Sequence, residues 1–81
     1  MFFVYILRSY KDNSHYYGYT SNLEKRLQEH NAGLSTYTKK HLPWELIYFE
    51  SFPTRSEAMK KEKFFKGLDG YHWLKENHII S

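Results

Sequence analysis

The chain of 81 residues has no cysteine, two prolines, four glycines and no long apolar run. Without cysteine it can build neither a disulfide framework nor a thiolate metal site, and we expect it in a reducing cytoplasm. No apolar run approaches the roughly 20 residues that span a bilayer, which excludes a membrane-spanning protein. The first residues lack the charged leader and small-residue cleavage site of a signal peptide, so we expect none.

Further absences exclude several kinds of metal and catalytic site. The five histidines show neither an HxxxH nor an HExxH pattern, so we expect no zinc site. The glycines form no phosphate-binding loop, and no serine sits in a nucleophile elbow. A catalytic site would therefore depend on phenols, carboxylates, imidazoles and basic side chains.

Aromatic residues are abundant: eight Tyr, six Phe and two Trp make up 20% of the chain. Each buried aromatic ring removes roughly 150–250 Å² from water, which helps a chain of this length to form one stable domain over residues 1–81. The net charge of +3 is compatible with a phosphate-bearing partner. The lysines gather in two segments, Lys60, Lys61, Lys63 and Lys66 in one and Lys39 and Lys40 in the other. A solvated helix face and a polar loop would explain these lysines as well.

Two β-rich runs, 2–7 and 15–20, flank a turn at 11–14 and predict a hairpin. Gly18 within the second run indicates a bulge or the close passage of another backbone. Residues 44–52 predict a third strand, with Trp44, Leu46 and Tyr48 on one face and Ile47 and Phe49 on the other.

Two capping boxes, Ser21–Glu24 and Thr54–Glu57, predict helices that run to about residues 31 and 68. Gly33 is placed to end the first helix, and Asp69-Gly70 to break the second. A short helix over 71–77 follows, and the core is closed by Trp73, Leu74, Ile79 and Ile80. The order ββαβαα predicts an α+β domain, a small sheet with helices packed on it.

A few polar side chains occupy positions from which chemistry is possible. Arg26 and His30 share one helix face at a spacing of four, which is also common surface decoration. Glu62 lies on the flank of an apolar stripe, where it needs a cation unless it points to solvent. Tyr5 and Tyr16 can pair across the hairpin on the side of Gly18, as ordinary sheet tyrosines also do.

Read in order, these segments resemble the GIY-YIG nuclease superfamily. Phe3-Val4-Tyr5 and Tyr16-Tyr17-Gly18 stand at its two signature triplets, the helix around Arg26 at its arginine helix, and residues 57–67 at its glutamate helix. The stretches 18–23 and 37–44 resemble the small stand-alone bacterial members grouped with the UvrC N-terminal domain. The resemblance extends from about residue 2 to residue 67.

The resemblance implies a three-stranded antiparallel sheet flanked by helices, and metal-dependent hydrolysis of nucleic-acid phosphodiesters, with DNA cut one strand per site in repair or processing. Glu62 would be the sole protein ligand of Mg²⁺ or Mn²⁺. Arg26 would hold the scissile phosphate. Tyr5 and Tyr16 would position the attacking water, with the choice of general base open between them, and His30 would relay a proton or contact a phosphate.

The resemblance also implies partners. The expected nucleic-acid contacts are Thr38, Lys39, Lys40 and Lys66, on a monomer or weak homodimer. Tyr19 stands where UvrC-like members carry a lysine, which removes a cation that could tune the phenols. A non-catalytic nucleic-acid-binding module is therefore the alternative function, and a protein-interaction module is a third.

Overall fold

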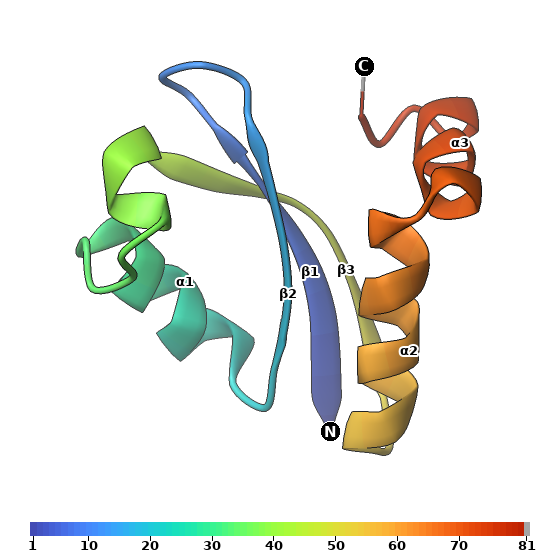
Figure 1. The fold of residues 1–81 in the computed structure, drawn as a ribbon. Coiled ribbons are helices and arrows are strands. Elements are labelled where there is room, and N and C mark those ends of the chain that lie inside the picture. Colours follow the sequence, from blue (N-terminus) through green and yellow to red (C-terminus); the bar gives the residue numbers. More distant parts are fainter. Residues whose placement is uncertain (81) are drawn as a thin grey trace.

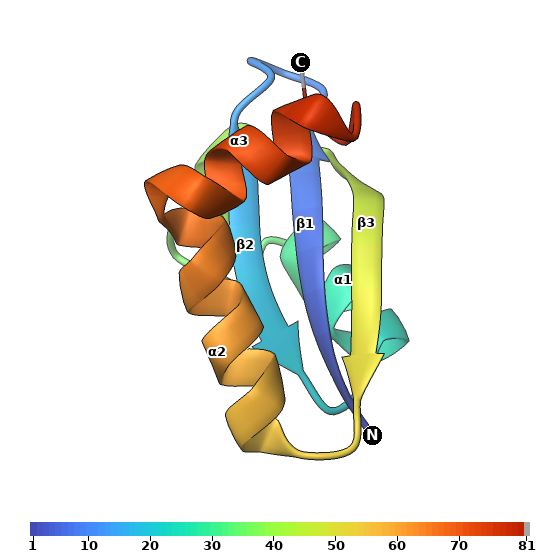
Figure 2. The same ribbon diagram turned by 90° about the vertical axis from the view of Figure 1, so that its right-hand side faces the viewer.

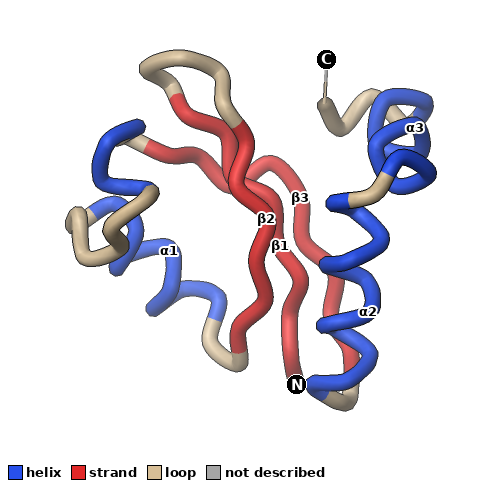
Figure 3. Tube along the Cα trace, in the orientation of Figure 1, coloured by secondary structure: helices blue, strands red, loops and turns tan. Residues whose placement is uncertain are grey.

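The computed structural model describes residues 1–80. These residues fold into seven elements (Figures 1 and 3): β1 (Phe2–Ser9), β2 (His15–Thr20), α1 (Leu23–Asn31), η1, a 3-10 helix (Thr38–His41), β3 (Trp44–Phe52), α2 (Arg55–Lys66) and α3 (Leu68–Glu76). The predicted α+β class and the order ββαβαα are confirmed. Within residues 1–80, no helix combines the length and apolar character needed to cross a bilayer.

The strands form one antiparallel sheet in the order β2-β1-β3. The central strand β1 is covered on both faces, so its run Val4 to Leu7 is almost entirely buried. α1 lies on one face of the sheet, and α2 and α3 lie on the other (Figures 1 and 2). β2 and β3 are the edge strands, and α2 runs over the β2 side of the sheet (Figure 2).

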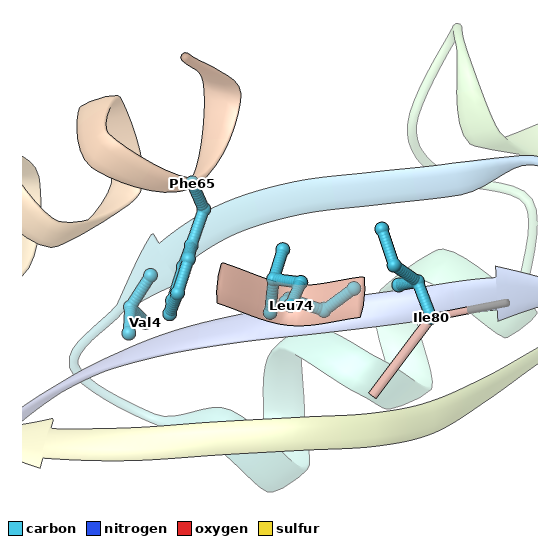
Figure 4. Packing of buried hydrophobic residues seen from close by; sticks show 5 residues of the cluster. Val4, Phe65, Leu74 and Ile80 are labelled. Atoms are coloured by element: carbon cyan, nitrogen blue, oxygen red, sulfur yellow. The ribbon is translucent and has the colours of Figure 1, made fainter. Parts of the chain in front are cut away.

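The alternation of side chains along β1 divides the core into two clusters. Val4 and Ile6 pack on the α2–α3 side with Phe65, Leu74 and Ile80 (Figure 4). The other cluster lies on the α1 side and is formed by Tyr5, Leu7 and Trp44. The C-terminal residues Trp73, Leu74, Ile79 and Ile80 all pack into or against the first cluster, as the sequence predicts.

A bulge in β3 changes which residues share a face. The pairing of β1 with β3 skips Ile47. Ile47 and Tyr48 therefore both pack on the α2–α3 side. Leu46 and Phe49 line a hollow on the α1 side. The predicted alternation, which placed Tyr48 with Leu46 and Ile47 with Phe49, is wrong because one extra residue shifts the phase of the strand.

The two capping predictions have different outcomes. At α2, Thr54 is the N-cap: its hydroxyl accepts from the Glu57 amide at 3.3 Å and donates to the Glu57 carboxylate at 2.8 Å. At α1, the cap is Asn22 and not Ser21, since the Asn22 side chain accepts from the Lys25 amide at 3.1 Å. Both asparagine and serine are good caps, and the better placed residue takes the role.

The junction between α2 and α3 also differs from expectation. α2 ends at Lys66, and Asp69 and Gly70 lie inside α3 instead of breaking a helix. A Cβ atom on Gly70 would lie 1.9 Å from the Phe64 carbonyl oxygen, so glycine is required for α3 to cross the end of α2. Leu68, the first residue of α3, is 70% exposed.

Candidate active site

Gly18 creates the space in which the two phenols meet. It pairs with Tyr5 in the β1–β2 register, and that register continues without a bulge. A Cβ atom on Gly18 would lie 2.6 Å from the Tyr5 hydroxyl and 3.1 Å from the Tyr16 ring. The close approach at Gly18 is thus that of a side chain, and the predicted bulge or backbone passage is wrong.

Three aromatic rings gather on the α1 side of the sheet. The ring centroids of Tyr5 and Tyr16 are 6.2 Å apart, and His30 of α1 lies 5.9 Å from Tyr5 and 4.8 Å from Tyr16. The ring centroid of Tyr37, which is 50% exposed, lies 6.0 Å from that of Tyr16. The structure therefore brings together the two tyrosines and the histidine that the sequence singled out.

A buried chain of hydrogen bonds runs through this group. The Tyr5 hydroxyl lies 2.9 Å from His30 Nε2, and His30 Nδ1 lies 2.8 Å from the Thr38 hydroxyl. His30 and Thr38 have no exposed surface, and Tyr5 is 1% exposed. Two expectations need correction: a phosphate cannot touch His30, and a nucleic acid cannot touch Thr38.

Burial also sets the protonation of this chain. Desolvation raises the pKa of Tyr5 to about 12, although the nearby Arg26 opposes the shift. Desolvation lowers the pKa of His30 to about 4, and the Arg26 charge acts in the same direction. At neutral pH Tyr5 is a protonated phenol and His30 a neutral imidazole. Both groups therefore hold their neutral forms in the absence of substrate.

Arg26 connects this buried group with solvent. Its side chain is 34% exposed and pairs with Glu29 at 3.2 Å. It lines a polar hollow of about 340 Å³, together with Thr20, Ser21, Asn22, Lys25 and Glu29. Burial alone would lower the pKa of Arg26, but the hydroxyls of Tyr5 and Tyr16 and the Glu29 carboxylate raise it. Arg26 is thus a permanent cation between the two tyrosine hydroxyls and the polar hollow.

Glu62 comes from the opposite face of the sheet. Its side chain is 17% exposed, and its nearest charged partner is Lys66 at 3.3 Å. Within residues 1–80 it forms no hydrogen bond with the phenols, His30 or Arg26. The structure thus brings Tyr5, Tyr16, Arg26 and His30 together and leaves Glu62 outside their direct contacts.

The orientation of α2 places Glu62 on the flank of the helix nearer β2. Neighbouring residues on a helix point about 100° apart, and Lys61 reaches Glu50 of β3 at 4.0 Å. Ala58 and Phe65 face the core between these two positions, so Glu62 lies on the flank toward β2, the strand that carries Gly18. Its charge contributes, as the weakest of several causes, to the raised pKa of Tyr5. At the free edge of β2, the sheet face that carries α1 adjoins the face that carries α2.

The residues present fit one kind of metal. Within residues 1–80, no three His, Asp or Glu side chains gather into a ligand set, so a metal at Glu62 would have fewer than three protein ligands of these types. Mg²⁺ accepts such a site because it keeps several waters and completes its shell with phosphate oxygens. Zn²⁺ needs three or four protein ligands. The Glu62 carboxylate therefore fits Mg²⁺, in competition with the Lys66 ammonium.

Exposed cations lie on both sides of the β2 edge. Lys39 and Lys40 project from η1, and Lys66 from α2. A shallow hollow of about 460 Å³ on α2 carries three more basic side chains, Arg55, Lys60 and Lys63. The sequence already indicates this cluster of lysines, which a solvated helix face would also explain. Residue order gives no signal for Thr38 as the partner of His30.

The chain is similar to known proteins along most of its length. The GIY-YIG catalytic domain matches residues 1–77. The UPF0213 protein lwe0147 of Listeria welshimeri is 51% identical over 79 residues, which cover 96% of this chain and 84% of the relative. The UPF0213 protein YazA of Bacillus subtilis is 51% identical over 82% of this chain and 67% of its own length.

One solved structure is also similar. The solution NMR structure of the UPF0213 protein BH0048 from Bacillus halodurans shares 34% identity with this chain. It superposes with a TM-score of 0.56, over 94% of this chain and 84% of that one.

Proposed function

Because the chain belongs to the GIY-YIG family, we propose that it is a divalent-metal-dependent endonuclease that hydrolyses phosphodiester bonds in DNA, one strand per active site. The observation that carries this proposal is the meeting of Tyr5, Tyr16 and Arg26 beside Gly18. Two phenols and a fixed cation at the mouth of a polar hollow suit a phosphate that gains negative charge in the transition state.

Each side chain has a role that its surroundings support. Arg26 binds the phosphate oxygens, since its guanidinium is both charged and partly exposed. Tyr16, half-buried beside Arg26, orients the attacking water. Tyr5 is a poor base because burial raises its pKa to about 12. Glu62 would hold Mg²⁺ or Mn²⁺, which when bound supplies Lewis-acid polarisation of the phosphate.

The basic side chains indicate a path for the nucleic acid. Arg26 and Lys25 lie on the α1 side of the β2 edge, and Lys63 and Lys66 lie on the α2 side. A strand that crosses this edge would contact both groups and place one phosphate between Arg26 and Glu62. A monomer or weak homodimer of so small a domain offers little surface for reading a base sequence, so recognition rests on backbone and shape.

The test is cleavage by the purified full chain of labelled single-stranded, nicked and branched DNA, with RNA of the same sequence as a comparison. We expect cutting that requires Mg²⁺ or Mn²⁺ and falls by about 100-fold or more in Glu62→Gln. Glu76→Gln removes an equal charge from an exposed position at the end of α3 and is the matched control. Equal rates for Glu62→Gln and the parent would contradict the metal assignment.

A second function is favoured by a specific observation. Glu62 pairs with Lys66 and makes no direct contact with the phenols, and Tyr19 replaces the lysine of UvrC-like members. Both features suit a nucleic-acid-binding module without turnover. Binding that weakens steeply with salt, without cleavage in Mg²⁺ or Mn²⁺, would support this alternative over the endonuclease.

A further inference from the structure

The chain of hydrogen bonds through His30 has two arrangements, and they differ in what Tyr5 can do. A neutral imidazole carries one N–H and one lone pair. In one arrangement Tyr5 donates to Nε2 and Nδ1–H donates to Thr38. In the other, the Thr38 hydroxyl donates to Nδ1 and Nε2–H donates to the Tyr5 oxygen. The distances of 2.9 Å and 2.8 Å suit both equally.

The surroundings of Thr38 separate the two. Within residues 1–80, the only hydrogen-bond partner of its hydroxyl is His30 Nδ1. Its carbonyl oxygen accepts from the Trp44 indole at 2.8 Å, which fixes the segment but offers the hydroxyl nothing. If Nδ1 carried the proton, the Thr38 O–H would face no acceptor in a space closed to solvent. An unpaired buried donor is unfavourable.

The other arrangement leaves its spare donor in a better place. With the proton on Nε2, the hydroxyl without an acceptor is that of Tyr5. Tyr5 lies beside Arg26, whose partly exposed side chain lines the polar hollow. Tyr5 itself is 1% exposed, and the partly exposed Arg26 side chain lies between its hydroxyl and the polar hollow, so a ligand that displaces this side chain can accept the Tyr5 hydrogen bond.

We infer that Thr38 holds His30 in the Nε2–H tautomer, so that the Tyr5 hydroxyl is kept as a hydrogen-bond donor for a non-bridging oxygen of the substrate phosphate. Thr38 is then a positioning residue. The tautomer follows from the geometry alone, whereas the use of the Tyr5 proton rests on the proposed function. In this arrangement the Tyr5 oxygen faces two donors, His30 Nε2–H and the Arg26 guanidinium, and has no lone pair left to act as a base.

The first experiment reads the tautomer directly. Nitrogen-15 NMR of the full chain with labelled histidine at neutral pH distinguishes a protonated from an unprotonated ring nitrogen at His30. We expect the proton on Nε2 and a hydrogen-bonded lone pair on Nδ1. A proton on Nδ1 would overturn the inference even if the protein cuts DNA, and the measurement needs no activity, so it is independent of the proposed function.

The second experiment uses Thr38 variants. Thr38→Val keeps the shape and removes the hydroxyl, whereas Thr38→Ser keeps the hydroxyl. We expect the Nδ1 resonance to move to that of a lone pair without a donor in Thr38→Val, with kcat about tenfold lower and KM unchanged. Thr38→Ser should keep both the parent spectrum and the parent kcat. If Thr38→Ser changes the tautomer, or Thr38→Val does not move the resonance, Thr38 does not position His30.

Discussion

The Tyr5 hydroxyl occupies the space that a side chain at residue 18 would fill, since a Cβ atom on Gly18 would lie 2.6 Å from it. The Tyr5 phenol can therefore extend over β2, the edge strand next to β1, only because residue 18 is glycine. The backbone of Gly18 shows no positive φ, so the requirement is one of space and not of conformation.

Gly18→Ala should separate the phenols from Arg26 while the fold is kept. The added methyl group meets a ring held by a buried hydrogen bond, and a displacement of about 1 Å at a catalytic group costs roughly 100-fold in rate. The measurement is the cleavage rate beside a circular dichroism melt. Gly67→Ala is the control, because its Cβ would find no atom closer than 3.5 Å. Parent-like cleavage by Gly18→Ala would show that the phenols do not need their present position.

Sequence patterns predict this fold well where the signal is local. The turn between β1 and β2, the Thr54 cap and the left-handed Gly33, with a φ of 79°, each depend on a few adjacent residues. The failures depend on contacts between distant segments. The bulge at Ile47 is a feature of the pairing of β1 with β3, and the glycine at 70 is required by Phe64 of another helix.

For the candidate site, too, the sequence predicts what depends on local signals and not what depends on contacts between distant segments. The sequence places Tyr5, Tyr16, Arg26 and His30 on suitable faces, because strand and helix periodicity fixes the direction of each side chain. Their convergence depends on how α1 packs on the sheet. The family resemblance predicts that Thr38 contacts nucleic acid. It is buried instead, since the first residue of η1 turns toward His30.

The stability of the protein should fall in mild acid because of His30. In the unfolded chain histidine titrates near ~6.5, whereas in the folded protein burial lowers the pKa of His30 to about 4. Between these values the unfolded state binds a proton that the folded state does not, so stability rises with pH. The contribution is complete above pH ~6.5 and decreases by up to roughly 3 kcal/mol as the pH falls toward 4.

Urea unfolding at several pH values, with the parent and His30→Gln, measures this contribution. The variant lacks the titrating group and should show a shallower loss of stability over the same range. His15, whose pKa burial also lowers, remains in both proteins and cancels in the comparison. Identical pH profiles for the two proteins would mean that His30 is protonated in the folded state or is not buried.

Gly70→Ala should destabilise the fold without touching the candidate site. A Cβ atom there would lie 1.9 Å from the Phe64 carbonyl oxygen and 2.6 Å from the Phe65 Cα, so α3 must move away from α2. We expect a loss of roughly 2–3 kcal/mol in the free energy of unfolding, as for other overpacked interiors. Asp69→Ala, one position earlier in α3, should cost less than about 1 kcal/mol. Similar unfolding midpoints for both variants would contradict the helix crossing.

The basic face of α2 should contribute to nucleic-acid affinity in proportion to the phosphates it neutralises. Lys60 and Lys63 line one hollow with Arg55, and neither forms an ion pair within residues 1–80, so both are available. Lys60→Gln with Lys63→Gln should weaken DNA binding at low salt and reduce the slope of log K against log salt by about 2.

The matched control is Lys11→Gln with Lys75→Gln, which removes the same net charge from the β1–β2 turn and from α3. If only net charge steers the nucleic acid, both pairs will lower the slope equally. A slope reduced in the α2 pair alone shows that the phosphates lie along α2, next to the flank that carries Glu62. Since α2 then holds both the strand and the metal-binding carboxylate, Glu62→Lys should lose cleavage but bind DNA at least as tightly as the parent, because it adds a cation to the face that the phosphates contact, whereas Glu62→Gln should lose cleavage with little change in binding.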